Sequence, residues 1–126
     1  MDVMEASRVL VVDDEPLIRW WLSESLGARG YEVVEAEDGH GAVGAMAESD
    51  AAFDLVLLDY RLPDSIDLAL LSQLRRLGPD ARFILMTAYG TPELEQQALD
   101  IGACAVVTKP FAIEDVETLN SDDRDG

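Results

Sequence analysis

Five short apolar runs alternate along the chain with segments of helical periodicity. The runs are RVLVV at 8–12, YEVVEA at 31–36, FDLVLL at 53–58, RFILMTA at 82–88 and AVVT at 105–108. Alternation of strands and helices is typical of a parallel sheet whose two faces are both covered by helices. The pattern therefore predicts a single, doubly wound α/β domain of the (βα)5 type with a five-stranded parallel sheet.

The first helical segment, which has Pro16 in its first turn, carries one apolar stripe. The members of the stripe recur at helical spacing: Ile18, Trp21, Leu22, Ser25 and Leu26. We expect this stripe to face the sheet. Trp20 lies off the stripe, so we expect its ring to be at least half exposed, either as a contact for a partner or as an incidental surface residue.

Four more helices are expected near 40–49, at 68–77, at 92–102 and after Phe111. Gly41 and Gly44 lie inside the second helix of the chain, which should make it the least stable of the set. The domain is expected to span 1–120. The polar, acidic end at 121–126 is expected to be a disordered tail or the start of a linker.

The charge balance constrains the partners. The 126 residues include 26 acidic and 9 basic ones, for a net charge of −17. Such a surface repels phosphate groups, which argues against direct binding of nucleic acid or membrane by this chain and favours divalent cations as ligands. No apolar run approaches the ~20 residues of a membrane span, and the start of the chain shows no signal peptide, so we expect a cytoplasmic protein.

Two residues that occur once each have a plain interpretation. Cys104, the only cysteine, is expected to be a small buried packing residue in a reducing compartment. His40, the only histidine, is expected to lie at the surface and not to act as a phosphohistidine.

Polar residues follow four of the five apolar runs at their carboxyl ends. They are an acid pair, Asp13-Asp14, a lone acid, Asp59, a hydroxyl, Thr87, and the pair Lys109-Pro110. In an open parallel sheet these ends form one crevice, so we expect the four groups to meet there. Carboxylates, a hydroxyl and an amine in one crevice predict a site for moving a phosphoryl group onto a carboxylate.

The acids at this edge favour a metal ion. An Asp-Asp pair alone is more often a turn or a helix cap than a metal site. Asp59 changes that balance, because it ends a buried run and would emerge beside Asp13 and Asp14, where three carboxylates repel one another unless they share a cation. A hard divalent ion such as Mg²⁺ suits one or two carboxylates and leaves positions for a phosphoryl oxygen.

The remaining groups fit the same chemistry. Asp59 can act as the nucleophile, since carboxylates form acyl phosphates. Lys109 can reach phosphoryl oxygens and Thr87 can donate its hydroxyl, although each alone would more simply be a surface lysine or a strand-end threonine. The Lys109–Pro110 bond invites a cis peptide that would turn the lysine into the crevice, against a base rate of ~5% for such bonds.

With the motifs VLVVDDEP, LVLLDYRLP, ILMTAYG and VTKPF, the chain resembles the receiver domain of bacterial two-component response regulators over nearly its whole length. The resemblance implies a flavodoxin-like fold with strand order 2-1-3-4-5 and a histidine kinase as phosphoryl donor. The wording IRWWL, DYRLPDS and MTAYGTPE is most similar to receivers of enhancer-binding transcription activators. In those proteins an ATPase and a DNA-binding domain follow.

The resemblance also assigns roles to single residues. It makes Asp59 the phosphoacceptor, Asp14 a direct Mg²⁺ ligand and Asp13 a second acid that acts through water. The backbone carbonyl of Arg61 would complete the protein's share of the coordination. Lys109, held by a cis bond to Pro110, would bridge to the phosphate.

Thr87 would be the switch hydroxyl, and two departures from the family pattern bear on the switch. Val106 stands where the family usually has the rotating Tyr or Phe, so the usual coupling between aromatic and threonine is in doubt. Ile66 and Asp67 replace the usual Asp-Gly pair, and the loss of glycine restricts the backbone of a loop that we expect to be unusually shaped or mobile.

The function expected from the sequence is a phosphoacceptor that switches an output domain or partner, with no enzyme activity beyond Mg²⁺-dependent self-phosphorylation and self-dephosphorylation. Two alternatives stay open. One is a phosphatase of the aspartyl-phosphate type, although such enzymes usually carry a second acid at the place of Arg61. The other is a pseudo-receiver that only binds proteins. A homodimer is also left open.

Overall fold

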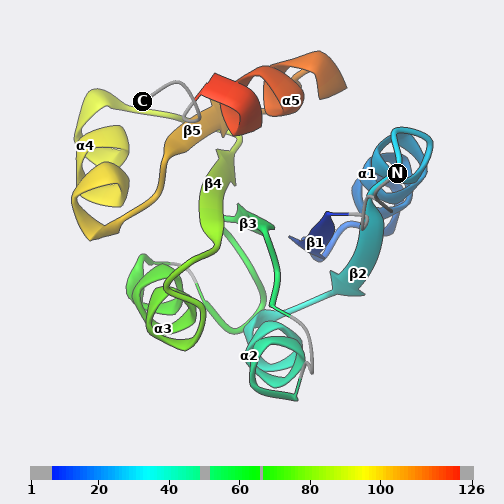
Figure 1. Cartoon of the computed structure of the whole chain (residues 1–126). Coiled ribbons are helices and arrows are strands. Elements are labelled where there is room, and N and C mark those ends of the chain that lie inside the picture. The colour runs from blue at the N-terminus through cyan, green and yellow to red at the C-terminus, as the bar shows by residue number, and fades with distance from the viewer. Residues whose placement is uncertain (1–6, 49–51, 66, 123–126) are drawn as a thin grey trace.

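The five apolar runs form one parallel sheet in the order β2-β1-β3-β4-β5 (Figure 1). The strands are β1 (Arg8–Val12), β2 (Glu32–Ala36), β3 (Leu55–Asp59), β4 (Arg82–Thr87) and β5 (Ala105–Thr108). The computed structural model describes residues 7–48, 52–65 and 67–122. The predicted fold class and strand order are therefore confirmed.

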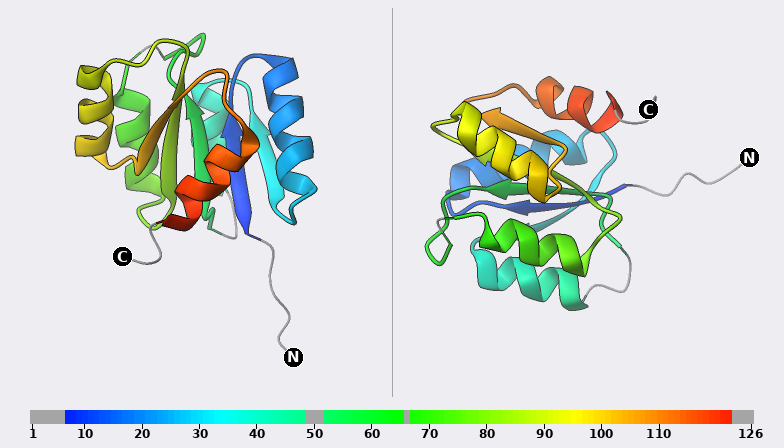
Figure 2. Two further views of the ribbon diagram at one scale, coloured as in Figure 1. Left: turned by 90° about the horizontal axis from the view of Figure 1, so that it is seen from above. Right: turned by 90° about the vertical axis from the view of Figure 1, so that its left-hand side faces the viewer.

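Helices cover both faces of the sheet, as the alternating pattern predicts (Figures 1 and 2). The helices are α1 (Pro16–Gly27), α2 (Gly39–Glu48), α3 (Ala69–Leu77), α4 (Pro92–Ile101) and α5 (Ile113–Asp122). Helices α1 and α5 pack on one face, and α2, α3 and α4 pack on the other. Among the described residues, no helix is both long enough and apolar enough to cross a membrane.

Successive residues of each central strand feed opposite faces of the core. On β1, Leu10 and Val12 join the cluster under α2, α3 and α4, while Val9 and Val11 join the cluster under α1 and α5. All four side chains are fully buried. The period of two along a strand explains the split, and burial on both faces explains why the strands are near-continuous apolar runs.

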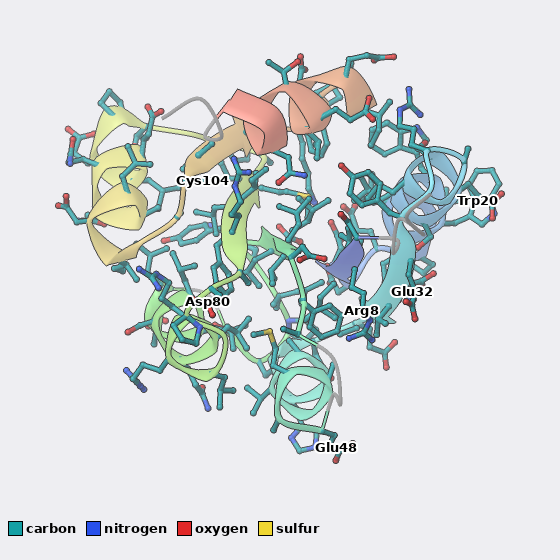
Figure 3. All side chains as sticks on the ribbon, viewed as in Figure 1. Arg8, Trp20, Glu32, Glu48, Asp80 and Cys104 are labelled. Carbon is teal, nitrogen blue, oxygen red and sulfur yellow. The ribbon has the colours of Figure 1, made fainter. Side chains whose placement is uncertain are left out.

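Helix α1 has the predicted stripe. Leu22 and Leu26 are fully buried against the sheet, and Trp21 packs against Phe111, two residues before α5, with 5.7 Å between ring centroids. The ring of Trp20 points away from the sheet and is 59% exposed, as expected (Figure 3). Leu17 lies one turn earlier and is 78% exposed.

The expectation for Cys104 is wrong, because its side chain is exposed (Figure 3). Cys104 lies at a bend directly before β5, and its amide donates to the carbonyl of Phe83 on β4 at 2.8 Å. At this bend Ala103 takes the buried position and Cys104 the outer one.

Two other expectations touch the edges of the described structure. Helix α5 runs to Asp122, so the acidic tail expected at 121–126 starts within its last turn, and 123–126 lie outside the described residues. The unusual loop expected at Ile66 and Asp67 is described only in part, because Ile66 lies outside the described residues. His40 is exposed on α2, as expected.

Candidate functional site

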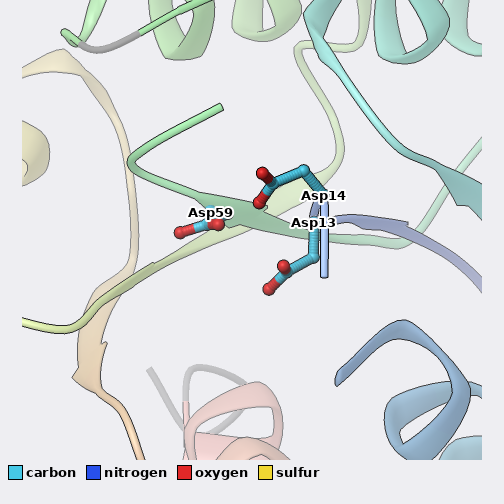
Figure 4. A group of neighbouring side chains, drawn as sticks. All are labelled: Asp13, Asp14 and Asp59. Carbon is cyan, nitrogen blue, oxygen red and sulfur yellow. The ribbon is translucent and has the colours of Figure 1, made fainter. Parts of the chain in front are cut away.

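Three carboxylates meet at the carboxyl edge of the sheet (Figure 4). Asp13 and Asp14 follow β1, Asp59 ends the adjacent strand β3, and the oxygens that they offer lie within 4.8 Å of one another. Asp13 is fully buried and Asp59 is 7% exposed, whereas Asp14 is exposed. The structure thus brings together the acids that the sequence singles out.

Asp13 is held on every side. Its amide donates to the carbonyl of Ala36 on β2 at 3.1 Å. One carboxylate oxygen, Oδ1, accepts from the amide of Glu15 at 2.9 Å, and the other, Oδ2, accepts from Lys109 Nζ at 2.8 Å. The buried charge of Asp13 is therefore both paired and hydrogen-bonded, which is the condition for burying a carboxylate without a large cost.

Asp59 is compensated far less. Its nearest cation is Lys109, with 3.5 Å between Nζ and Oδ2, and the amide of Arg61 donates to its Oδ1 across 3.4 Å. Burial, and then the negative charge of Asp13, raise the pKa of Asp59 from 3.8 to about 6. Of the two buried acids, Asp59 has the longer contacts with positive charge and with hydrogen-bond donors of the protein. An added cation would therefore stabilise its ionised form.

Lys109 is the positive centre of the site. It follows β5, its bond to Pro110 is cis, and its amide donates to the carbonyl of Thr87 at 2.8 Å. Its ammonium contacts Asp13, Asp59 and, at 3.3 Å, Glu15. Burial alone would lower the pKa of Lys109, but the hydrogen bond and charge of Asp13, with Asp59 and Glu15, raise it above its ordinary value. The lysine stays charged and anchored toward Asp13.

Thr87 ends β4 on the other side of Asp59. It is 4% exposed, and its Oγ1 accepts from the amide of Tyr89 at 3.2 Å. A Cβ at Gly90 would lie 3.0 Å from Thr108 Oγ1 and 3.7 Å from the Thr87 methyl, so the glycine lets this loop pack closely over both threonines. Val106 pairs with Leu85 inside the sheet and packs against the core under α4.

A cavity of about 440 Å³ opens over these groups. Its lining combines the acids with the groups around them: Asp14, Glu15, Asp59, Tyr60, Arg61, Thr87, Ala88, Tyr89 and Lys109. Hard oxygen ligands in one cavity with an ammonium and a hydroxyl fit a hard divalent cation together with a phosphoryl group. The under-compensated charge of Asp59 is the observation that such a cation would satisfy.

A larger cavity, of about 700 Å³, lies between α2, α3 and the β3–α3 loop. Its polar residues serve helix ends. Asp64 accepts from the amides of Gly39 at 2.8 Å and His40 at 3.0 Å, and Asp67 accepts from the amide of Ala69 at 3.0 Å. The hydrogen bonds from the amides of Gly39 and His40, with the Gly39 bond the larger cause, lower the pKa of Asp64. We place the candidate site in the smaller cavity because the buried acid Asp59 and Lys109 line it.

Two residues of the site neighbourhood escape the sequence analysis. Arg19 donates from Nη1 to the carbonyl of Asp13 at 2.7 Å, and Asp64 ties the loop that follows β3 to the start of α2. Both side chains bind backbone atoms of residues that are distant in the sequence or in another element, and no sequence motif predicts such contacts. The absence of a Cβ at Gly39, which would meet Asp64 Oδ1 at 3.1 Å, is the one sequence signal consistent with the second contact.

Comparison with known proteins identifies the family of this chain. Residues 9–119 match the family described as the response regulator receiver domain. The transcriptional regulatory protein PdtaR of Mycobacterium tuberculosis is 41% identical over 118 residues, which are 91% of this chain and 55% of PdtaR. Sporulation initiation phosphotransferase F of Bacillus subtilis is 32% identical over 113 residues, 90% of each chain.

Solved structures agree with the fold. A response regulator from Burkholderia pseudomallei, crystallised with a phosphorylated aspartic acid, calcium ion and citrate, superposes with a TM-score of 0.85 at 27% identity and covers 94% of this chain and 71% of that one. A CheY-like receiver domain from Methanospirillum hungatei gives 0.83 at 29% identity, with 96% and 99% covered. The chain belongs to the response regulator receiver domain family of two-component signalling.

Proposed function

We propose that Asp59 is the phosphoacceptor of this receiver and that Mg²⁺ assists the transfer. The supporting observation is the contrast at the acid cluster, where Asp13 is fully paired while the buried Asp59 carboxylate is not. With a pKa of about 6, Asp59 is mostly ionised at pH 7 and available as a nucleophile. The relative from Burkholderia carries a phosphorylated aspartic acid in its crystal structure.

The residues divide the work of the transfer. An oxygen of Asp59 attacks the phosphorus, and the bond from phosphorus to the donor, a histidine nitrogen of the kinase, breaks with its electron pair leaving on the donor. Lys109 neutralises charge on the phosphoryl oxygens, and the Thr87 hydroxyl donates to one of them. Asp13, Asp14, Asp59 and the backbone carbonyl of Arg61 would hold Mg²⁺, which supplies charge neutralisation when bound.

The test is incubation with Mg²⁺ and acetyl phosphate, followed by intact-mass spectrometry. We expect one phosphate per chain, and none for Asp59→Asn. Asp54→Asn is the matched control, because Asp54 lies five residues earlier at the other end of β3 and accepts from the amide of Arg8. Labelling of Asp59→Asn at the parent rate, or equal loss in both variants, would contradict the assignment.

We further propose that the phosphorylated domain controls a transcription-activating output of the enhancer-binding type in the cytoplasm. AtoC of Escherichia coli, a regulatory protein, is 34% identical over 113 residues, which make up 24% of its length. A homodimer, which stays open, would have to overcome the repulsion between two chains that each carry a net charge of −17. Sedimentation at low and high salt, with and without beryllofluoride, tests the dimer.

A further inference from the structure

Arg19 connects three parts of the structure beside the acid cluster. Its Nη1 donates to the carbonyl of Asp13 at 2.7 Å, and its Nε lies 3.3 Å from Oε1 of Glu35 on β2. The hydroxyl of Ser23, one helical turn further along α1, holds the other oxygen of Glu35 at 2.7 Å. The side chain of Arg19 is only 17% exposed, so the guanidinium is a fixed part of the fold.

The carbonyl that Arg19 holds belongs to the peptide bond between Asp13 and Asp14. The turn that carries these residues from β1 into α1 receives little help from the helix, because Glu15 at the N-cap makes no side-chain capping bond and Pro16 has no amide hydrogen. The Asp13 carboxylate accepts from the Glu15 amide across this turn, and Arg19 supplies a charged donor to the carbonyl of the peptide itself. The direction in which the exposed Asp14 leaves the strand depends on the orientation of this peptide.

We propose that Arg19 is a positioning residue for the metal site: its bond to the Asp13 carbonyl holds the Asp13-Asp14 turn so that Asp14 faces Asp59, and Glu35 keeps the guanidinium in place. The proposal rests on the metal site assigned under Proposed function. A bond of this kind orients the groups that bind the metal, and such supporting contacts often matter to affinity as much as single ligands do.

Electrostatics alone makes the opposite prediction. A guanidinium near the acid cluster repels a cation, so removal of its charge should tighten Mg²⁺ binding. Loss of positioning should weaken it. The sign of the change in affinity therefore separates the two roles of Arg19.

The chain offers a matched control in Arg29. It follows α1, pairs with two carboxylates, Glu117 Oε1 at 2.9 Å and Glu114 Oε2 at 3.4 Å, and donates to one backbone carbonyl, that of Ser25, at 3.1 Å. These are the same kinds of contact that Arg19 makes, but they tie α1 to α5 and do not involve the acid cluster. A general loss of stability should affect Arg19→Met and Arg29→Met alike.

The experiment is calorimetric titration of MgCl₂ into the parent, Arg19→Met and Arg29→Met, well below their unfolding temperatures. We expect about 10-fold weaker binding for Arg19→Met, at the low end for loss of a supporting contact, and unchanged binding for Arg29→Met. In acetyl phosphate labelling, the half-saturating Mg²⁺ concentration should rise for Arg19→Met while the rate at saturating Mg²⁺ stays within two-fold, on the order expected when a ligand is only repositioned.

Equal or tighter binding by Arg19→Met overturns the proposal, as does an equal loss in Arg29→Met or a lower saturating rate with unchanged half-saturation. If Arg19→Met does not fold, Glu35→Gln decides by the same criteria, because it removes the anchor and leaves the arginine. If the parent itself binds no Mg²⁺, the proposed metal site fails and this inference fails with it. Binding by the parent with no effect of Arg19→Met refutes the inference alone.

Discussion

Asp13 and Asp59 are two buried aspartates at the same sheet edge, and both contact the same lysine. The carboxylate of Asp13 accepts from Lys109 Nζ at 2.8 Å and from a backbone amide at 2.9 Å. The carboxylate of Asp59 lies 3.5 Å from the same Nζ and 3.4 Å from a backbone amide. The shorter contacts satisfy the charge of Asp13 within the fold. The longer ones leave Asp59 with a raised pKa and an open side. Position relative to one ammonium separates a carboxylate whose charge is satisfied within the fold from the one that we propose as the phosphoacceptor.

The largest expected effect is that two substitutions change the free energy of unfolding in opposite directions. Asp13→Asn should destabilise the fold by about 3 kcal/mol, because it breaks a buried ion pair and weakens the anchor of Lys109. Asp59→Asn should stabilise it at pH 7, on the order of 3 kcal/mol for a pKa raised from 3.8 to about 6. Urea unfolding of both variants and the parent, in a metal chelator, measures the difference.

The pH dependence of this effect follows from linkage. The folded state favours protonated Asp59, so the contribution of Asp59 to the stability of the parent is most favourable below pH 3.8 and is lost as the pH rises from 3.8 through about 6. The advantage of Asp59→Asn should therefore be near zero at pH 4 and complete above pH 7. An advantage that stays constant from pH 4 to pH 8 would contradict the raised pKa.

The second expected effect concerns the open side of Asp59. Thr87→Ala should keep phosphorylation within about several-fold, because the hydroxyl contributes one hydrogen bond among several charged contacts. It should abolish the conformational response to beryllofluoride, seen as exchange broadening of α4 amides by NMR. Thr87 is the contact that can differ between the two states, and the loop to Pro92 packs on it through Gly90.

Thr87→Ser is the matched control for this switch, because it keeps the hydroxyl and loses only the methyl group. The response should return in Thr87→Ser. A full response in Thr87→Ala would place the switch elsewhere, with Lys109 as the next candidate.

A third, smaller effect concerns water at the open side. Arg61 and Tyr89 line the cavity over Asp59, and the Tyr89 side chain is 83% exposed. Both are bulky enough to screen a phosphoryl group on Asp59 from attacking water, so self-dephosphorylation should take minutes or longer. Replacement of both by alanine should shorten the lifetime of the acyl phosphate, measured by loss of label after removal of the donor. An unchanged lifetime would refute the shielding.

The smallest expected effect lies outside the acid cluster, on the helix that follows Asp13. Leu17 and Trp20 form an exposed apolar surface on α1, and exposed aromatics of this kind are frequent binding hot spots. Trp20→Ala should slow transfer from the cognate kinase and leave labelling by acetyl phosphate intact. Leu77→Ala, at an exposed leucine on α3, is the control. Equal loss with both donors would make Trp20 structural.

Local sequence carries most of the fold because the strands are buried on both faces. The β3 segment from Leu55 to Asp59 is buried at every position. Its apolar run is stable only as a central strand that helices cover on both faces. Cys104 shows where this reasoning stops. Its apolar neighbours suggested burial, but Cys104 lies at a bend directly before the edge strand β5, and the sequence does not define which residue of such a bend faces inward.

The acid cluster was predictable for a similar reason. Each of the four residues lies at the carboxyl end of a strand or directly after it, and parallel strands end at one edge: Asp13, Asp59, Thr87 and Lys109. The unequal distances from Lys109 to the two acids were not predictable, because they depend on rotamers and on the turn after β1. The contact from Arg19 to the Asp13 carbonyl was missed for the same reason, since a backbone carbonyl leaves no trace in the sequence.

The contact of Asp64 with the start of α2 has a consequence for local unfolding. The amides of Gly39 and His40 donate to a carboxylate that lies 25 and 24 residues further along the chain, in the segment that leaves Asp59. Those amide protons can exchange with solvent only when the carboxylate moves away or the helix frays. The hydrogen exchange rates of these two amides therefore measure how often the β3–α3 loop opens. The measurement needs no label near the acids.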